Sequence, residues 1–441
     1  MPHKIYFATA ILLLLAACTK FEDAEMTERN SFVHFYSSAD DYIGSVAELD
    51  SDGGYILSGE IRYDDGVTDA LIIKTDARGH KMWEKIIPNG VINAIKPTDN
   101  GYILLGDSIE INTDNQNTAE VSELVNSYAR LMLLDKQGNI LSQHITFSTV
   151  TRSEDNKLIT LHVDYHGDAL ALDASGNIIV LGSFRAPDEN ESAFVSAFPA
   201  ADISDSLWYI SYQSLQHDYI NSNAVHVTNS SNIVWASKMF IQDQNLSRGF
   251  LSVPHVGINS AHINNSVYGE SDARNHSVED MQKSSVGYCA IGTYSETNGL
   301  NGNMYFIRID ANLNVLPESA RYIDGEELML NDRILNSQEK TSSSSFDEGL
   351  ALVATNEGYV LAGSMESTPT VGNGGKDILL VKVDPFGNLL GKKLLGGSGD
   401  ESVTSILETP DGGLLIFGTN TVNGLSSMVL MKTDRDGNLD N

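Results

Sequence analysis

The stretch His162-Val163-Asp164-Tyr165-His166 carries the side chains in this sequence best suited to chemistry. In an extended strand, residues two apart share a face, so His162, Asp164 and His166 would point the same way. Imidazole and carboxylate groups are ligands of zinc, manganese or iron. The three residues therefore suggest a metal ion at the rim of the fold. Three alternating residues carry little information, and a polar segment without a metal is the interpretation that we favour.

Other patterns that carry chemistry are missing. The sequence has no Gly-x-Ser-x-Gly motif of serine hydrolases. Gly375-Lys376 lacks the upstream glycine of a phosphate-binding loop. The run from Asp434 to Asn438 is similar to the start of a calcium loop, but its length and later acidic ligand are absent, so it predicts a plain turn. We predict no catalytic residue, no cofactor-binding residue and no cofactor other than the rim metal ion.

The first 17 residues are predicted to be a secretory signal peptide. Lys4 precedes an apolar run from Tyr6 to Ala17, about a dozen residues, whereas a membrane-spanning helix needs roughly 20. The following Leu15-Ala16-Ala17-Cys18 resembles the lipobox of bacterial lipoproteins, in which the cysteine is acylated and becomes the first residue of the mature chain. The resemblance implies a lipid anchor at Cys18, with residues 18–30 as its tether.

This anchor implies a place in the cell envelope. Several acyl chains on one cysteine bind a membrane firmly, since each buried methylene contributes about 0.8 kcal/mol. The acidic Glu22 and Asp23 resemble the export signal of surface lipoproteins in some Gram-negative bacteria. We therefore expect an outer-membrane lipoprotein that can be exposed at the cell surface, and the sequence leaves the membrane leaflet open.

Charge and cysteine content narrow the partners and the source of stability. Removing Lys4 with the signal leaves 27 basic and 59 acidic residues, a net charge of −32, which would repel nucleic acid and anionic headgroups. The only other cysteine is Cys289, inside an apolar run, so no intrachain disulfide is expected. Cys289 is predicted to be a small buried apolar residue, and stability is expected to come from core burial.

A repeat organises the rest of the chain. Its clearest copy begins with Gly53-Gly54-Tyr55-Ile56-Leu57-Ser58-Gly59, and a fixed five-residue interval between a turn residue and a small residue returns with a mean period of about 60 residues. The seven copies are Gly54/Gly59, Gly101/Gly106, Asn177/Gly182, Asn232/Ser237, Gly287/Gly292, Gly358/Gly363 and Gly413/Gly418.

Each copy is followed by a second apolar strand, which in five copies ends in an aspartate before a turn, as at Asp76, and in the other two ends at Pro199 and near Pro254. In four copies a basic residue stands two positions before the aspartate, as in Lys74/Asp76. This recurrence predicts a structural role, with the aspartate side chain starting the turn and the lysine extending along the strand end. A further short strand before each copy and one after the turn give four strands per repeat, which is one blade of a β-propeller.

The last copy lacks its fourth strand, while residues 31–36 form an extra strand before the first copy. We therefore predict that residues 31–36 complete the last blade and that residues 31–441 form one closed propeller domain of seven four-stranded blades. Six or eight blades remain alternatives, because the copies around residues 240–285 are degraded. Two stretches outside the repeat, 119–129 and 326–340, are predicted to contain short helices.

These glycine-glycine-tyrosine and lysine-threonine-aspartate repeats resemble those of lipid-anchored bacterial β-propellers within the broad WD40-like and quinoprotein-like group. The resemblance spans residues 31–441 and implies a fold; it does not imply an activity, because propellers host both enzymes and passive scaffolds. Our leading hypothesis is a non-catalytic module that binds a protein or a glycan through insertions at 107–127, 183–192 and 364–377. The alternative is a glycan-active lyase or hydrolase with its site at the channel mouth.

Overall fold

The protein is almost entirely β-structure, as the sequence predicts. The computed structural model describes residues 31–439 except 113–123, 147, 155–156, 188, 213–216, 230–231, 242–244, 255–261, 269–273, 297–300 and 337–344. Its one helix within these residues is α2 (Gly325–Asn331), which falls in the stretch 326–340. In the part of the chain that the structure describes, no helix has the length and apolarity needed to cross a membrane.

The described strands form seven antiparallel sheets, which we number in chain order. Sheet 1 contains β2 (Asp41–Leu49), β3 (Tyr55–Arg62), β4 (Thr68–Thr75) and β5 (Lys81–Ile87). Sheet 2 contains β6 (Gly90–Thr98), β7 (Gly101–Asn112), β8 (Leu124–Asp135) and β9 (Ile140–Thr146). Sheet 3 contains β10 (Ser148–Glu154), β11 (Lys157–Leu172), β12 (Ile178–Arg185), β13 (Ser192–Phe198) and β14 (Trp208–Tyr212). Sheet 4 contains β15 (His217–Asn229), β16 (Asn232–Ile241), β17 (Leu246–Pro254) and β18 (His262–Tyr268).

Sheet 5 contains β19 (Asn275–His276), β20 (Asp280–Lys283), β21 (Gly287–Ser295), β22 (Asn303–Asp310), β23 (Arg321–Ile323) and β24 (Leu335–Asn336). Sheet 6 contains β25 (Asp347–Thr355), β26 (Gly358–Glu366), β27 (Lys376–Val383) and β28 (Leu389–Leu395). Sheet 7 contains β29 (Asp400–Glu408), β30 (Leu414–Val422), β31 (Leu425–Thr433) and β1 (Phe32–Tyr36).

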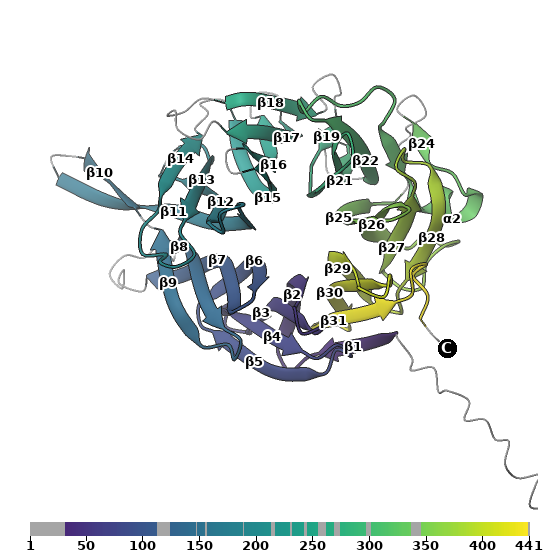
Figure 1. Ribbon diagram of the computed structural model, residues 1–441, viewed down its shortest axis with the longest axis horizontal. Coiled ribbons are helices and arrows are strands. Elements are labelled where there is room, and N and C mark those ends of the chain that lie inside the picture. The colour runs from purple at the N-terminus through teal and green to yellow at the C-terminus, as the bar shows by residue number, and fades with distance from the viewer. Residues whose placement is uncertain are drawn as a thin grey trace, which may run out of the picture.

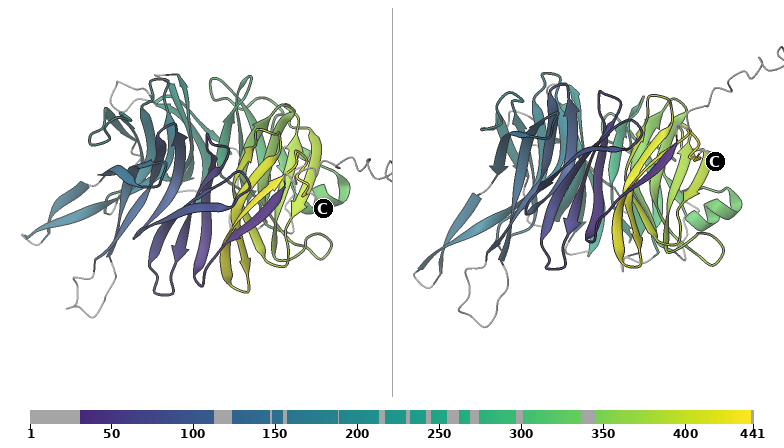
Figure 2. Two further views of the ribbon diagram at one scale, coloured as in Figure 1. Left: turned by 60° about the horizontal axis from the view of Figure 1, so that its bottom comes forward. Right: turned by 90° about the horizontal axis from the view of Figure 1, so that it is seen from below.

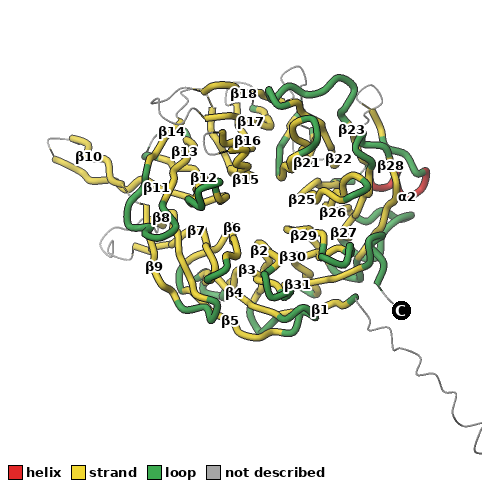
Figure 3. The backbone as a smooth tube through the Cα atoms, viewed as in Figure 1, coloured by secondary structure: helices red, strands yellow, loops and turns green. Residues whose placement is uncertain are grey.

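The sheets follow one another around a central space, where the innermost strands are β2, β6, the second half of β11, β15, β20, β25 and β29 (Figure 1). Because consecutive strands are antiparallel, the tight turns within each repeat lie at one end of the sheets, and the longer connections lie at the other (Figure 2). We call the end with turns such as 76–79 the turn face. The opposite end, with the connections 63–67 and 367–375, is the loop face. Figure 3 draws the loops and turns of both ends in green.

The two ends of the described chain meet in sheet 7. β1 pairs antiparallel with β31, from Phe32 opposite Lys432 to Tyr36 opposite Met428, which confirms the pairing predicted for residues 31–36. β1 also reaches sheet 1, because the Tyr36 hydroxyl donates to Gly79 O at 2.6 Å. On the inner side, Gly44 N of sheet 1 donates to Thr419 Oγ1 of sheet 7 at 3.0 Å.

The predicted aspartate turns are confirmed on the turn face. Asp76 Oδ1 accepts hydrogen bonds from the backbone N–H groups of Arg78 and His80, both at 2.9 Å, and Gly79 has a φ of 79°, where a side chain is disfavoured. The same geometry recurs at Asp434, which forms the plain turn predicted there. It also recurs at Asp135, Asp173, Asp310 and Asp384.

The core consists of apolar clusters between neighbouring sheets, as expected for strands covered on both faces. Cys289 lies in one of them, fully buried and unpaired, and burial raises the pKa of its thiol to about 12. One helix prediction is wrong: residues 124–129 belong to strand β8, where the ladder with β7 overrides the local helical spacing.

Candidate functional site: the central cavity and its mouth

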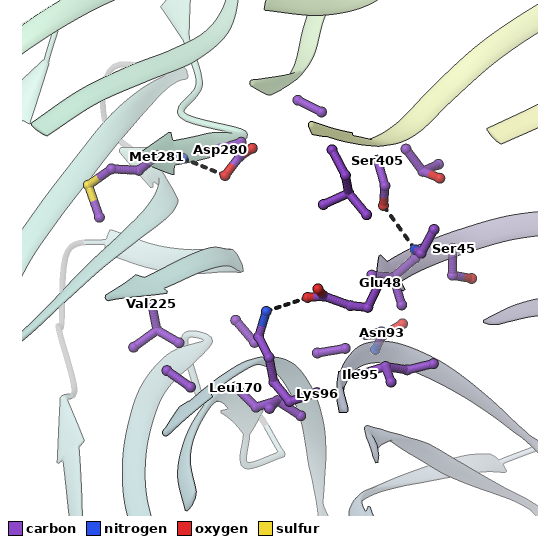
Figure 4. A pocket seen from close by; sticks show the side chains of 18 of the residues that line it. Ser45, Glu48, Asn93, Ile95, Lys96, Leu170, Val225, Asp280, Met281 and Ser405 are labelled. Atoms are coloured by element: carbon purple, nitrogen blue, oxygen red, sulfur yellow. Dashed lines mark hydrogen bonds and ion pairs between the residues drawn. The ribbon is translucent and has the colours of Figure 1, made fainter. Parts of the chain in front are cut away.

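A cavity of about 460 Å³ occupies the centre of the molecule (Figure 4). Every one of the seven sheets contributes its innermost strand or the residues beside it. The lining segments are 45–48, 93–96, 168–172, Val225 with Val227, 279–282, 350–352 and 404–407. The cavity is therefore a shared product of all seven sheets, and no single sheet could form it.

A β-bulge recurs in the innermost strands and adds a residue to the cavity lining. The register with the next strand shifts between Gly44 and Val46, and the same shift occurs in four other sheets. A bulge leaves its extra residue outside the regular pairing and re-aims its side chain. The extra residues, all of which line the cavity, are Ser45, Asn93, Asp168, Leu350 and Thr404.

The lining is polar and carries more acidic than basic groups. Lys96 forms an ion pair with Glu48 of the neighbouring sheet, and Figure 4 shows the two side chains meeting across the cavity wall. The other ionisable residues of the lining are the acids Asp168, Glu279 and Asp280. A ligand here would meet carboxylates, hydroxyls, an amide and small apolar side chains.

Asp280 is an acid of the cavity lining whose pKa is shifted by burial. Burial raises the pKa of its carboxyl group to about 7, although its two oxygen atoms accept hydrogen bonds from Met281 N at 2.6 Å and Leu352 N at 2.9 Å. Burial also raises the pKa of the neighbouring Glu279. Asp280 thus joins sheet 5 to sheet 6 through backbone groups, a role that holds its carboxyl group in place.

His166 and Asp107 form a charged pair at the mouth, on the loop face. His166 Nδ1 lies 3.0 Å from Asp107 Oδ2, and Asp107 Oδ1 accepts from Gly167 N at 2.8 Å. The hydrogen bond to Asp107 raises the pKa of His166 to about 9, and the charges of Asp168 and Glu191 act in the same direction. His166 is therefore a cation at neutral pH, held by acids of sheets 2 and 3.

The structure places the three residues of the predicted rim metal site on strand β11, but it does not gather them. His162 is exposed and packs edge-on against Tyr128, Asp164 accepts from Ser127 N at 3.1 Å, and His166 turns to Asp107. Among the described residues, no group of three or more His, Cys, Asp or Glu side chains is arranged to hold a metal ion. The metal site stays a prediction, and Cys18 lies outside the described residues.

The described residues of the predicted insertions 107–127, 183–192 and 364–377 fall on the loop face. Strands β7 and β8 extend beyond the repeat into the insertion 107–127, and β10 with the first half of β11 forms a hairpin that projects from sheet 3 (Figure 1). Sequence reasoning missed Glu48, Lys96 and Asp280 as cavity residues, and Asp107 as the partner of His166. The cavity lining is a ring of residues from all seven sheets. The only local signal that could have located it is the extra residue of each bulge, such as Asn93, which stands just before a small residue of the innermost strand.

Comparisons with known proteins establish no family for this chain. No family model matches, and no curated protein sequence matches. The chain is similar in structure to the Trypanosoma rangeli sialidase, with 7% identity and a TM-score of 0.39 over 89% of this chain and 55% of the sialidase, so it spans about half of that protein.

Two further solved structures are similar along nearly their whole length. A protein of unknown function from Dyadobacter fermentans has 8% identity and a TM-score of 0.43, covering 91% of this chain and 97% of its own. The N10 neuraminidase-like protein of a bat influenza virus, A/little yellow-shouldered bat/Guatemala, has 7% identity and a TM-score of 0.41, covering 91% and 99%. At these identities and TM-scores the similarities carry no assignment of activity.

Proposed function

We propose that this chain is an exported lipoprotein whose seven sheets are the blades of a closed β-propeller, and that it binds a protein or glycan ligand without catalysis. The observation that carries the proposal is the central cavity, to which all seven sheets contribute. The pairing of β1 with β31 and the contact of Gly44 with Thr419 support closure, because they join the first sheet to the last. Closure removes the sheet edges that would otherwise aggregate.

The anchor and the ligand surface lie at opposite faces in this proposal. Phe32, where the tether ends, pairs with Lys432, two residues before the turn that begins at Asp434, so β1 starts at the turn face. Cys18 and Ser31 are separated by 12 residues, so the 13 steps between their Cα atoms can span at most roughly 45 Å. A lipid anchor at Cys18 would hold the turn face toward the membrane and present the loop face, with its insertions, outward.

A polar ligand fits the cavity better than an apolar one. The lining offers the hydroxyls of Ser45 and Thr404, the amide of Asn93 and the Glu48–Lys96 pair. Pockets with a few convergent polar groups and apolar walls are typical of small-molecule and sugar sites. The acidic lining disfavours an anionic ligand, so a neutral or cationic group is the expected occupant.

Lipidation and ligand binding are tested separately. Metabolic labelling with a radioactive fatty acid should mark the wild-type chain and not Cys18→Ser, and unchanged labelling of the variant would remove the anchor from the proposal. Soluble Cys18→Ser protein is then applied to a glycan array and used in pull-downs from envelope extracts.

The expected binding signal is lost in Asn93→Ala/Thr404→Ala and kept in Asp384→Ala, a turn-face control. Blank results in both assays for the unmutated protein would reject the binding proposal.

A glycan-active enzyme is the second candidate function, favoured by the raised pKa of Asp280. A carboxyl group with a pKa of about 7 is half protonated at neutral pH and can donate a proton, as a general acid must. Reducing-end and unsaturated-product assays on a panel of polysaccharides would detect hydrolysis or elimination. Turnover that is lost in Asp280→Asn would replace the binding proposal by the enzymatic one.

A further inference from the structure

Two buried carboxylates face each other between sheets 6 and 7 on the loop face, apart from the central cavity. Asp377 is in β27, at the end of the insertion 364–377, and Glu401 is in β29. Asp377 is fully buried, and Glu401 is 4% exposed. Charges at this depth are costly unless an opposite charge or a full set of hydrogen bonds compensates them.

The two carboxylates converge on one small space beside Gly396. A side chain at position 396 would place its Cβ atom 1.9 Å from Asp377 Oδ1 and 2.7 Å from Glu401 Oε2, so only glycine fits. Both carboxylates are buried, so their negative charges repel each other in a poorly hydrated place.

The compensation available from the described protein atoms is incomplete. Asp377 Oδ2 accepts from the Ser367 hydroxyl at 3.0 Å and from Asn373 N at 2.8 Å, but its Oδ1 is buried without a hydrogen-bond partner. Glu401 Oε2 accepts from Gly397 N at 3.1 Å. Among the described residues no lysine or arginine forms an ion pair with either carboxylate, and Lys376 Nζ lies 3.7 Å from Glu348 instead.

A third oxygen donor lies on the same face. Asn420 is directly opposite Glu401 in the ladder between β29 and β30, so the two side chains share a side of the sheet. The Oδ1 atom of Asn420 is also buried and has no hydrogen-bond partner. Asp377 shares the space beside Gly396 with Glu401, and Asn420 lies opposite Glu401 in the ladder; Asp377 and Asn420 thus each have one buried oxygen atom without a hydrogen-bond partner.

We propose that Asp377, Glu401 and Asn420 bind a calcium ion. Only oxygen atoms are offered, which suits a hard cation, and Ca²⁺ accepts carboxylate, amide and backbone oxygen atoms in flexible geometry. The charge of Ca²⁺ balances the two carboxylates. The bound ion joins the insertion 364–377 to the connection 396–399, so it holds part of the loop face rigid beside sheet 7.

Calcium binding is measured on the mature chain carrying Cys18→Ser, after dialysis against EGTA. Isothermal titration with CaCl₂ at constant ionic strength should give one site per chain, and Ca²⁺ should raise the melting temperature. Glu401→Gln and Asp377→Asn should each weaken binding at least tenfold, and Asn420→Ala less. Asp384→Asn, which removes the same charge from an exposed turn on the opposite face, is the matched control and should bind as the unmutated chain does.

The alternative is that the two carboxylates share a proton. In that case millimolar Ca²⁺ leaves the melting temperature and the titration heat of the unmutated chain unchanged, and this result overturns the proposal. If Asp377→Asn fails to fold, Glu401→Gln still tests the site, because it removes a charge and keeps the hydrogen bond from Gly397 N. Titration with MgCl₂ tests the ion: equal or tighter binding of Mg²⁺ would also contradict a calcium site. None of these measurements depends on the ligand of the central cavity.

Discussion

The turn face and the loop face hold their carboxylates in different ways. On the turn face, Asp76 and its equivalents accept backbone hydrogen bonds within their own turns, and the pKa of Asp384 lies below its usual range for that reason among others. On the loop face, Asp347, Asp377 and Glu401 are buried, and burial raises the pKa of Asp347 and Glu401. The aspartate turns of the turn face repeat one arrangement, whereas the loop face contains buried carboxylates that the repeat does not explain, and those groups are where function should be sought.

Removing β1 should have the largest effect. Deletion of residues 31–36 exposes the edge of β31 and takes away Phe32 and Val33, whose burial stabilises by roughly 1.5–3 kcal/mol each when complete. We expect aggregation or loss of the cooperative unfolding transition, measured by size-exclusion chromatography and calorimetry. Deletion of residues 19–30 is the control and should leave both unchanged. A monomeric, cooperatively unfolding protein without residues 31–36 would show that the two ends need not pair.

Among single substitutions, the largest loss of stability is expected on the turn face, at Asp50. This side chain is 1% exposed, lies 3.3 Å from Lys74 Nζ, and accepts from Tyr102 and Lys136, both at 2.6 Å. Asp50→Ala removes a buried partner of Lys74, so it should lower the free energy of unfolding, measured with urea, by about 3–5 kcal/mol. Asp52→Ala, which removes a half-exposed partner of the same lysine, should cost less than about 1 kcal/mol. Equal costs would mean that burial does not distinguish the two carboxylates.

The buried carboxylates of the loop face should make the free energy of unfolding fall as the pH rises, whereas ordinary carboxylates make it rise. Asp347 has a pKa raised by burial from 3.8 to about 7, so the folded state keeps a proton that the unfolded state releases. Its contribution to stability is therefore lost as the pH rises from about 4 to about 7. Asp347→Asn should flatten this part of the curve of unfolding free energy against pH, measured with EGTA present. An unchanged slope would place the effect on Asp280 or Glu279.

Asp107→Asn should have a smaller effect that is local to the cavity mouth. Without the carboxylate, the pKa of His166 should fall from about 9 toward its ordinary value of 6.5. Since His166 contributes stability below 6.5 and loses it as the pH rises through 9, the variant should be less stable than the unmutated chain mainly at neutral pH and below. NMR titration of the imidazole resonances measures the pKa. A value that stays near 9 would assign the shift to Asp168 and Glu191.

The smallest effect is expected from a single repeat turn. Asp384→Ala removes the acceptor for Phe386 N and Asn388 N, both in an exposed turn, and should cost about 1 kcal/mol. Urea unfolding monitored by circular dichroism is sufficient to detect it. A cost as large as that of Asp50→Ala would mean that the turns, and not the buried clusters between sheets, dominate stability.

Most of the strand order could be predicted from the sequence because its signals are local. The five-residue interval from Gly54 to Gly59 and the aspartate turns depend on backbone conformation within a few residues, and they recur. The strand of residues 31–36 and its partner could be inferred from counting strands per repeat. The helix prediction for residues 124–129 was wrong because it rested on local spacing, which does not encode the pairing of β8 with β7.

The candidate sites were harder to predict because they depend on contacts between sheets. Asp107 is 59 residues from His166, and Asp280 meets Leu352 72 residues away. Nothing in the local sequence links such pairs. The cluster of Asp377 and Glu401 has the same character, since its acids belong to different sheets. The His162 pattern, in contrast, was visible locally, and the structure distributes its three side chains among three different neighbours.

The ladder between the first and last described strands also bears on how the molecule is made. Phe32 is synthesised 400 residues before its partner Lys432. During that interval β1 has no partner strand, and its apolar side chains are available to chaperones or to neighbouring chains. Sheet 7 can therefore form only after β31 has been synthesised, and proteolytic loss of β31 would release β1 from the folded protein.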